Sequence, residues 1–306
     1  MILCSGEALI DMLPRESTQG ESVFAPYPGG AVFNTAIALG RLDVPVSFFS
    51  GLSSDLFGEQ LAASLAGSGV NSDLAHRSDR PTTLAFVTLT DGHASYAFYD
   101  ENTAGRMLAP TDLPSLGDDV SAMFFGGISL VVEPCATAYE ALCLREAPSR
   151  VTMIDPNIRP SFIKDEVTYR ARIDRMTEVS DIVKLSDEDL AWLTGTASIE
   201  DGIAKLLDSG PALICITRGG DGVTGYTTAG AVDVAANKVE VVDTVGAGDT
   251  FNAGFLAALH DAGALTKSAV RSLDEDTIRA ALRLGAQAAA ITVSRAGANP
   301  PTRAEL

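Results

Sequence analysis

Short apolar segments alternate along most of this chain with segments whose apolar residues recur at helical spacing. The segments expected to form strands are residues 2–5, 46–50, 122–125, 151–154, 181–185, 212–217 and 238–242. The segments expected to form helices are residues 31–42, 59–68, 135–145, 169–179, 187–194, 199–209, 249–262 and 276–293. Because short buried strands separated by helices pair in parallel, this alternation predicts a three-layer α/β/α fold with a mostly parallel central sheet.

One region interrupts the alternation. Residues 81–90 and 94–99 are β-rich and flank Asp91-Gly92-His93, a pattern that predicts a β-hairpin with a tight turn. The hairpin is too short to form a domain, so we interpret it as an excursion from the main sheet. The prediction is a single α/β domain over residues 1–306, with a small β lid built from about 12–25 and 82–107.

Composition excludes several classes of function. The 306 residues include 40 Asp and Glu against 22 Lys and Arg, which gives a net charge of −18. Such a surface repels nucleic-acid phosphates and anionic bilayers, and no basic cluster compensates, so we expect no nucleic-acid or membrane partner.

The start of the chain lacks the pattern of a secretory signal, which indicates a cytoplasmic protein. The four cysteines form no CxxC pair, so we expect buried, reduced thiols and no structural zinc.

The most informative stretch runs from Asp243 to Asp249, with the sequence Asp-Thr-Val-Gly-Ala-Gly-Asp. A β-rich run ends at Asp243, Gly246 and Gly248 permit a tight turn, and an apolar-periodic helix opens at Asp249. Backbone N–H groups at such a helix start form an anion site. A carboxylate there suits a base that takes a proton from a hydroxyl beside the transferred phosphate. The alternative is an ordinary first-turn acid that the helix dipole favours, preceded by a glycine turn.

A second glycine pair, Gly29-Gly30, also leads into a helix. Asn34 lies in the first turn of that helix, where its amide can donate to and accept from neighbouring hydroxyls of a polyol. The alternative is a capping Asn beside a glycine turn. Asp11 and Arg159 each follow a predicted strand, and ligands of open α/β sheets bind at that edge.

The two glycine motifs, in this order and spacing, resemble the two signatures of the ribokinase-like (PfkB-type) carbohydrate kinases, as does the segment 51–58. The similarity runs over essentially the whole chain. Residues 6–14 and 96–104 resemble the bacterial fructokinases within this family. The resemblance implies the ribokinase-like fold and transfer of the γ-phosphoryl group of ATP to a primary hydroxyl of a ketohexose, foremost D-fructose, giving fructose 6-phosphate.

The resemblance also implies roles for single residues. Asp249 is expected to take the proton from the sugar hydroxyl, while Gly246, Ala247 and Gly248 stabilise the transferring phosphoryl group. The residues expected to hold the sugar are Asp11, Gly30, Asn34, Tyr96, Phe98 and Arg159. The residues expected around the nucleotide are Lys184, Thr217, Arg218, Gly219, Gly222, Gly246, Gly248 and Asn299, with 288–299 beside the adenine.

Two metal expectations follow from the resemblance. The family carries an Asn-x-x-Glu motif that organises Mg²⁺ through water, and the matching segment here departs from it as Ser186-Asp187-Glu188-Asp189. The expected Mg²⁺ residue is therefore one of Asp187, Glu188 and Asp189, and the alternative is an acidic first turn on a capped helix. Family members also bind a monovalent cation, and K⁺ here would take backbone oxygens of Asp243, Val245, Thr292, Arg295 and Gly297.

Other functions stay open at this stage. The acceptor could be another small polyol, such as 2-keto-3-deoxygluconate, ribose or a nucleoside, or the fold could serve as a non-catalytic sugar or nucleotide sensor. Tyr96 and Phe98 could be ordinary alternating strand residues rather than a cover for the sugar. An exposed apolar face on the hairpin would favour a homodimer through the lid.

Overall fold

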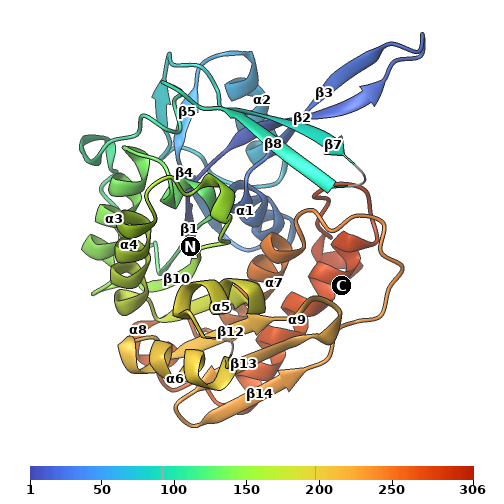
Figure 1. The fold of residues 1–306 in the computed structure, drawn as a ribbon. Coiled ribbons are helices and arrows are strands. Elements are labelled where there is room, and N and C mark those ends of the chain that lie inside the picture. The colour runs from blue at the N-terminus through green and yellow to red at the C-terminus, as the bar shows by residue number, and fades with distance from the viewer. Residues whose placement is uncertain (91–92, 197) are drawn as a thin grey trace.

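The computed structural model describes residues 1–90, 93–196 and 198–306. Its large sheet has the strand order β14-β13-β12-β11-β10-β9-β1-β4, and Figure 1 shows helices packed over it. The strands are β1 (Ile2–Ser5), β4 (Val46–Phe49), β9 (Ala122–Gly126), β10 (Val151–Asp155), β11 (Ile182–Ser186), β12 (Leu213–Thr217), β13 (Val223–Thr227) and β14 (Gly230–Val234). Pairing is parallel from β4 to β12 and antiparallel between β12, β13 and β14. The predicted mostly parallel α/β sheet is confirmed.

The two faces of this sheet bury separate hydrophobic clusters, which makes three layers. On β1, Ile2 and Cys4 belong to one cluster and Leu3 to the other, because alternate residues of a strand point to opposite faces. The first cluster includes residues of α1 (Ala31–Arg41), α2 (Leu56–Gly67), α7 (Ala247–Asp261), α8 (Lys267–Val270) and α9 (Glu275–Val293). The second includes residues of α3 (Cys135–Glu146), α4 (Glu166–Val179), α5 (Asp187–Thr194) and α6 (Ile199–Ser209).

A smaller sheet lies beside the large one and is called the lid sheet below. It has the order β3-β2-β7-β8, formed by β2 (Leu9–Glu16), β3 (Ser22–Gly29), β7 (Leu84–Thr90) and β8 (His93–Tyr99). Figure 1 shows β2 and β3 extending from the body as a two-stranded arm. The predicted antiparallel pairing of the hairpin strands is present, with Ala85 opposite Phe98, whereas positions 91 and 92 of its expected turn lie outside the described residues. A short pair, β5 (Gly51–Ser53) and β6 (His76–Ser78), lies apart from both sheets.

The strand expected at residues 238–242 is wrong. The segment is irregular, its side chains Val239, Val241 and Val242 are exposed, and the Val242 N–H donates to the carbonyl oxygen of Val293 at 2.8 Å rather than to a strand. Its apolar residues alternate as in a strand, but Val239 and Val241 line a cavity. The β13–β14 hairpin forms the edge of the sheet opposite β4, and sequence analysis did not predict it.

Local signals placed several helix ends correctly. Ser186 caps α5 as predicted, because its hydroxyl accepts from the Asp189 N–H at 3.0 Å and the Asp189 side chain accepts from the Ser186 N–H in return. Helix α7 begins at Ala247, two residues before the predicted Asp249, and its N-cap Gly246 has a left-handed backbone conformation. All four cysteines are buried and free, as predicted. Among the described residues, no helix combines the length and apolar character needed to cross a bilayer.

Candidate active site

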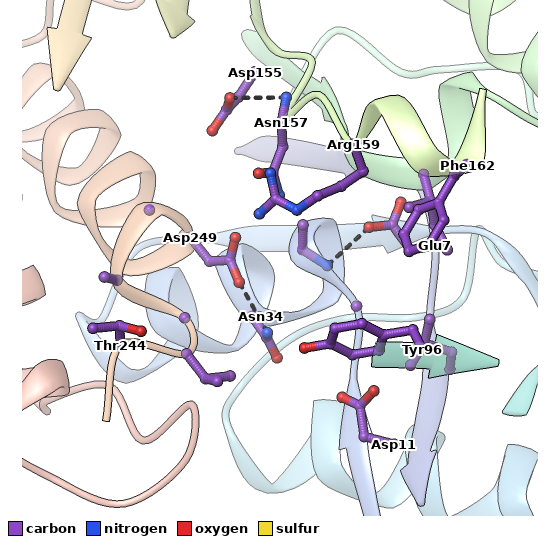
Figure 2. Close-up of a pocket in the computed structure, with 18 of the residues that line it drawn as sticks. Glu7, Asp11, Asn34, Tyr96, Asp155, Asn157, Arg159, Phe162, Thr244 and Asp249 are labelled. Carbon is purple, nitrogen blue, oxygen red and sulfur yellow. Dashed lines mark hydrogen bonds between the residues drawn. The ribbon is translucent and has the colours of Figure 1, made fainter. Parts of the chain in front are cut away.

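A cavity of about 770 Å³ lies where the lid sheet faces the carboxyl ends of the large sheet's strands. It is called the acceptor cavity below. Figure 2 shows that its polar side chains come from separate elements and point toward one another. The predicted residues that line it are Asp11, Gly30, Asn34, Tyr96, Phe98, Arg159, Gly246, Ala247, Gly248 and Asp249. The fold therefore brings together all six predicted sugar residues and the predicted catalytic loop.

The glycine loop forms the start of helix α7. Gly246 has φ 78°, a conformation that costs other residues energy, and it has no side chain with which to cap the helix. The N–H of Ala247 donates weakly to the Thr244 carbonyl oxygen at 3.3 Å. The N–H groups that follow it lie in the first turn, where a helix offers no acceptor of its own, at the positive end of the helix dipole. An anion at this point would receive both hydrogen bonds and favourable helix electrostatics.

Asp249 is held at the floor of the acceptor cavity by two residues of α1. The Asn34 Nδ2 atom donates to Asp249 Oδ2 at 2.9 Å, and the Thr35 hydroxyl donates to the Asp249 backbone oxygen at 3.2 Å. Burial raises the pKa of Asp249 from 3.8 to about 7, while the Asn34 hydrogen bond opposes that rise. A carboxylate with a pKa near neutrality can both accept and release a proton at physiological pH.

A second carboxylate, Asp11, lies on β2 of the lid sheet. Burial raises its pKa from 3.8 to about 6. Gly29, on the paired strand, leaves room for it, since a Cβ atom at position 29 would overlap Asp11 Oδ2. Burial and then the negative charge of Asp11 also raise the pKa of Tyr96. These groups give the acceptor cavity hydrogen-bonding partners suited to several neighbouring hydroxyls.

Aromatic rings form one wall of the acceptor cavity. Tyr96 and Phe98 on β8 stack with centroids 6.1 Å apart, and Phe98 meets the edge of Phe162 at 4.8 Å. Phe162 belongs to a short 3₁₀ turn, η3 (Pro160–Phe162), directly after Arg159. The exposed Arg159 donates to the backbone oxygen of Ile158, and Figure 2 shows its side chain among the cavity residues. The wall thus joins the lid sheet to the body.

A second cavity, of about 670 Å³, lies on the other side of the glycine loop. It is called the nucleotide cavity below. Thr217, Gly219, Gly222 and Gly248 are the predicted nucleotide residues that line it. Much of the remaining lining is apolar and comes from Val239, Val241, Phe251, Ala286, Ala289, Ala290 and Val293. Because Thr244, Ala247 and Gly248 line both cavities, the loop separates them by its own thickness.

Four predicted nucleotide residues lie outside the lining of this cavity, and one of them, Gly246, lines the acceptor cavity instead. Arg218 donates to the Thr224 hydroxyl at 2.7 Å, and Asn299 accepts from Arg41 at 2.8 Å. Lys184 is buried and pairs with Asp155, with Nζ 3.0 Å from Oδ2. A Cβ atom on Gly248 would lie 3.3 Å from Lys184 Nζ, so this cation is adjacent to the glycine loop.

Sequence analysis gave no role to several residues that line the acceptor cavity, notably Glu7, Asp155, Asn157 and Phe162. Asp155 ends strand β10, and its Oδ2 accepts from both Lys184 and Asn252, at 3.0 and 2.7 Å. A carboxylate at the end of a buried strand is the signal that would have found it, the same signal that singled out Asp11.

The three candidate Mg²⁺ residues differ in their surroundings. Asp187 and Glu188 are exposed on the first turn of α5, whereas Asp189 is buried. One Asp189 oxygen accepts from the Ile158 N–H at 3.0 Å and the other from the Ser186 N–H at 3.2 Å. Burial and then the nearby charge of Asp155 raise the pKa of Asp189.

The residues expected around a monovalent cation come from two loops that Asp243 holds together. One oxygen of its side chain accepts from the Val245 N–H at 3.0 Å, and the other accepts from the Gly297 N–H at 2.9 Å. The Thr292 carbonyl oxygen accepts from the Arg295 N–H at 3.0 Å, in the turn that follows α9. Backbone oxygens of both loops are the hard donors that K⁺ requires.

Known proteins resemble this chain over nearly its whole length. The model of the pfkB family of carbohydrate kinases matches residues 1–305. A fructokinase from Rhizobium leguminosarum bv. trifolii is 56% identical over 280 residues, which cover 91% of this chain and 86% of that protein.

Solved structures of fructokinases also resemble this chain over most of its length. Fructokinase from Xylella fastidiosa with bound ATP has a TM-score of 0.88 at 31% identity, covering 97% of this chain and 93% of that one. A double mutant of Vibrio cholerae fructokinase with fructose, ADP and potassium ion has a TM-score of 0.85 at 26% identity, with the same coverage of 97% and 93%. The chain therefore belongs to the pfkB family of carbohydrate kinases, as its two glycine motifs predicted.

Proposed function

We propose that this kinase is an ATP-dependent fructokinase that phosphorylates the primary hydroxyl of D-fructose to give fructose 6-phosphate. The observation that carries the proposal is the position of Asp249, which faces the acceptor cavity directly beyond the loop that separates it from the nucleotide cavity. The 56% identity to a fructokinase favours fructose over other polyols as the acceptor.

The geometry supports direct transfer between the two cavities. The sugar hydroxyl attacks the γ-phosphorus, the bond between that phosphorus and the β,γ-bridging oxygen breaks, and ADP leaves. Asp249 accepts the hydroxyl proton, and the Asn34 amide holds the carboxylate in place. The N–H groups at the start of α7 stabilise the negative charge on the equatorial oxygens, an effect worth roughly 3–4 kcal/mol per donor in other enzymes.

The aromatic wall of the acceptor cavity keeps water away from the phosphoryl group. Tyr96 and Phe98 come from the lid sheet, so a bound sugar would lie between them and the glycine loop. Exclusion of water matters because a water molecule in place of the sugar hydroxyl would hydrolyse ATP. The lid thus couples phosphoryl transfer to the presence of the sugar.

We also propose Mg²⁺ as the companion of ATP, with Asp189 as the residue that orders its water. Asp189 is the buried member of the predicted trio, and each of its oxygens keeps a lone pair beyond its backbone partner. Bound Mg²⁺ would neutralise charge on the phosphates while keeping several of its own waters. The backbone oxygens near Asp243 would take K⁺, the ion named in the Vibrio cholerae structure.

The decisive experiment is a coupled assay that follows ADP release with D-fructose, D-ribose, 2-keto-3-deoxygluconate and a nucleoside as acceptors. We expect kcat/KM to be highest for fructose, and ³¹P NMR of the product to show phosphate on the 6-hydroxyl. A higher kcat/KM for another acceptor would replace fructose, and no turnover with any acceptor would favour the sensor.

The lid sheet is also our proposed surface for a homodimer. Phe24 on β3 and Tyr99 on β8 are 45% and 64% exposed, and both rings contact Phe86 on β7, so they share one face of the lid sheet. Such a group of apolar side chains on exposed strands favours a partner surface. Sedimentation equilibrium of the wild type and of Phe24→Glu tests this, and a monomeric wild type at micromolar concentration would exclude the dimer.

A further inference from the structure

Glu7 bridges two elements at the edge of the acceptor cavity. It follows β1, its Oε1 atom accepts from the Ala31 N–H at 2.8 Å, and its Oε2 atom accepts from the Ser129 N–H at 3.2 Å. Figure 2 shows the carboxylate facing the start of α1, with the dashed line to the first helical residue. Ser129 belongs to η2 (Gly127–Leu130), a 3₁₀ turn after β9.

Two glycines make this bridge possible. Gly30 has φ 111°, and a Cβ atom there would lie 2.8 Å from the Glu7 backbone oxygen. Gly127 has φ 69°, and its Cβ atom would overlap the Glu7 carboxylate. Both positions need glycine for their backbone conformation and for the close approach of Glu7. The contact is therefore built into the two turns that it joins.

Each end of the bridge leads to the acceptor cavity. In α1, Asn34 lies one turn beyond Ala31, its N–H donates to the Gly30 carbonyl oxygen at 2.8 Å, and its side chain holds Asp249. In η2, Ile128 lines the cavity directly before Ser129. Moving the start of α1 would move Asn34 and, through it, the Asp249 carboxylate.

The charge of Glu7 also suits this place. Its carboxylate lies at the N-terminal, positive end of the α1 dipole and accepts two backbone N–H groups, both of which favour its ionised form. Burial opposes them and raises the pKa of Glu7. Cys135 and Tyr139 face Glu7 from α3, and burial raises the pKa of both so that they stay neutral.

We propose that Glu7 is a positioning residue, which ties the start of α1 to η2 so that Asn34 and Asp249 meet the acceptor hydroxyl in the correct geometry. This inference rests on the proposed kinase function. Glu7 joins backbone groups of two turns, a contact that does not depend on a bound sugar, so its role differs from that of a sugar ligand such as Asp11. A misplaced catalytic group commonly costs roughly 100-fold in rate, which sets the scale of the effect.

Two variants separate geometry from charge. Glu7→Gln keeps the length of the side chain but removes the charge and replaces one acceptor by an NH₂ group, which repels the backbone N–H. Glu7→Asp keeps the charge but is one methylene too short to reach both partners. We expect kcat with fructose and ATP to fall roughly 10- to 100-fold in each variant.

The pH profile supplies a readout that a purely structural role would not move. Within the part of the chain that the structure describes, the charges that shift the pKa of Asp249 are those of Asp155 and Glu7, which raise it, and that of Lys184, which lowers it. Removing the Glu7 charge therefore lowers the pKa of Asp249. We expect the acidic limb of kcat/KM to move to lower pH in Glu7→Gln and to stay near the wild-type position in Glu7→Asp.

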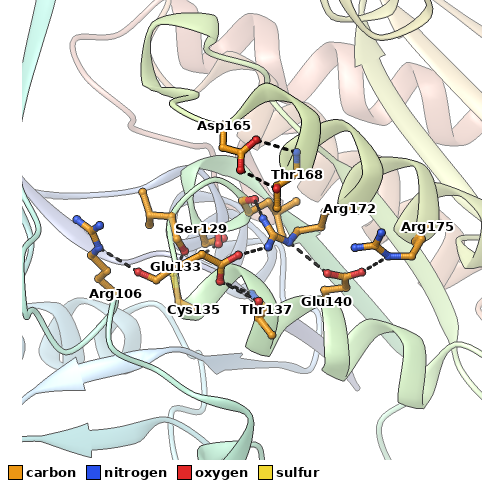
Figure 3. A network of polar contacts seen from close by, with 12 residues as sticks. Arg106, Ser129, Glu133, Cys135, Thr137, Glu140, Asp165, Thr168, Arg172 and Arg175 are labelled. Atoms are coloured by element: carbon orange, nitrogen blue, oxygen red, sulfur yellow. Dashed lines mark hydrogen bonds and ion pairs between the residues drawn. The ribbon is translucent and has the colours of Figure 1, made fainter.

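Glu140 offers a matched control. Figure 3 shows it on α3, paired with Arg172 and Arg175, and these three residues are not part of the acceptor cavity lining. Glu140→Gln also removes one partly buried glutamate charge, and we expect lower thermal stability with unchanged kcat and pH profile.

Each outcome decides the proposal. Wild-type kcat and pH profile in Glu7→Gln would overturn it, as would a higher fructose KM at unchanged kcat, which would make Glu7 a sugar ligand. If Glu7→Gln fails to fold, wild-type kcat in Glu7→Asp overturns the proposal, and failure of both to fold assigns Glu7 to folding instead. Failure of the proposed function would show separately, as a wild-type enzyme that leaves fructose unphosphorylated.

Discussion

The Nδ2 atom of Asn34 lies 2.9 Å from Oδ2 of Asp249, although 215 positions separate the two residues in the chain. Each residue stands in the first turn of a helix that begins after a glycine with positive φ, Gly30 for α1 and Gly246 for α7. This hydrogen bond brings the helices that follow the two glycine motifs together at the acceptor cavity, where the sugar hydroxyl is expected to bind. It makes Asn34 the partner that orients the proposed base as well as a candidate ligand of the sugar.

The first prediction concerns the base itself. Asp249→Asn removes the proton acceptor but keeps the shape of the side chain, so we expect kcat to fall by roughly 10²- to 10⁴-fold. ATP binding measured by calorimetry is expected to stay within about threefold of wild type, because the nucleotide cavity lies across the loop. Turnover close to wild type would remove Asp249 from the role of base.

The second prediction is the pH dependence of the reaction. The pKa of Asp249 is raised to about 7, and the base must be ionised to accept a proton. Below pH 7 the carboxyl is increasingly protonated, so we expect kcat/KM to fall about tenfold per pH unit on the acidic side. A profile that stays level down to pH 5 would contradict this assignment.

The third prediction links the same group to stability. Between its ordinary pKa of 3.8 and the raised value of about 7, Asp249 binds more protons in the folded than in the unfolded chain. Its contribution to stability is therefore present below pH 3.8 and is lost as pH rises through 7. Asp249→Asn cannot ionise, so we expect its Tm to exceed that of wild type at pH 8 and to approach it at pH 4. Equal Tm values at both pH values would contradict the burial of this charge.

The fourth prediction tests the glycine loop. Gly246 has φ 78°, and a Cβ atom there would lie 2.8 Å from the Cβ of Ala298, so Gly246→Ala combines backbone strain with a clash. Gly195, at the end of α5, has φ 68° with nothing within 4 Å, which makes Gly195→Ala a control for strain alone. We expect about 1 kcal/mol of destabilisation in the control with normal kcat. Gly246→Ala is expected to lose more stability and most of its activity, as seen by chemical denaturation and the coupled assay.

The fifth prediction concerns the aromatic wall. Phe98→Ala removes a ring that packs on Phe162 at 4.8 Å, so we expect a higher KM for fructose and an unchanged KM for ATP. ATP hydrolysis without sugar is expected to rise as water enters the cavity. Tyr99→Ala, on the adjacent position of β8, is the control, because Tyr99 points to the opposite face and contacts Phe86. Equal effects of the two variants would mean that the wall does not cover the sugar.

Sequence patterns predicted the parts of this molecule that local chemistry determines. Glycine turns before helices and apolar strands between them depend on neighbouring residues, so β1, α5, α6 and the loop at Gly246 were placed within two residues. The strand prediction for residues 238–242 was wrong because it also relied on local pattern alone. The alternating valines of this segment follow a strand pattern, yet they border the nucleotide cavity.

Sequence patterns could not predict which side chains from distant segments contact one another. Lys184 is a lone cation in a buried strand, and only the folded chain shows that its partner is Asp155 from the adjacent strand. Arg218 likewise follows a strand at the ligand-binding edge but turns back to Thr224. Glu7 lacked a distinctive motif, since its role depends on turns that lie 24 and 122 positions away.

The thin partition formed by residues 244–248 has a stereochemical consequence. Because ATP and the sugar lie on its two sides, the γ-phosphorus moves from the bridging oxygen of ATP to the sugar oxygen in a single displacement. A single displacement inverts the arrangement of the other three oxygens around phosphorus. ATP made chiral at the γ-position with oxygen isotopes would therefore yield a sugar phosphate of inverted configuration.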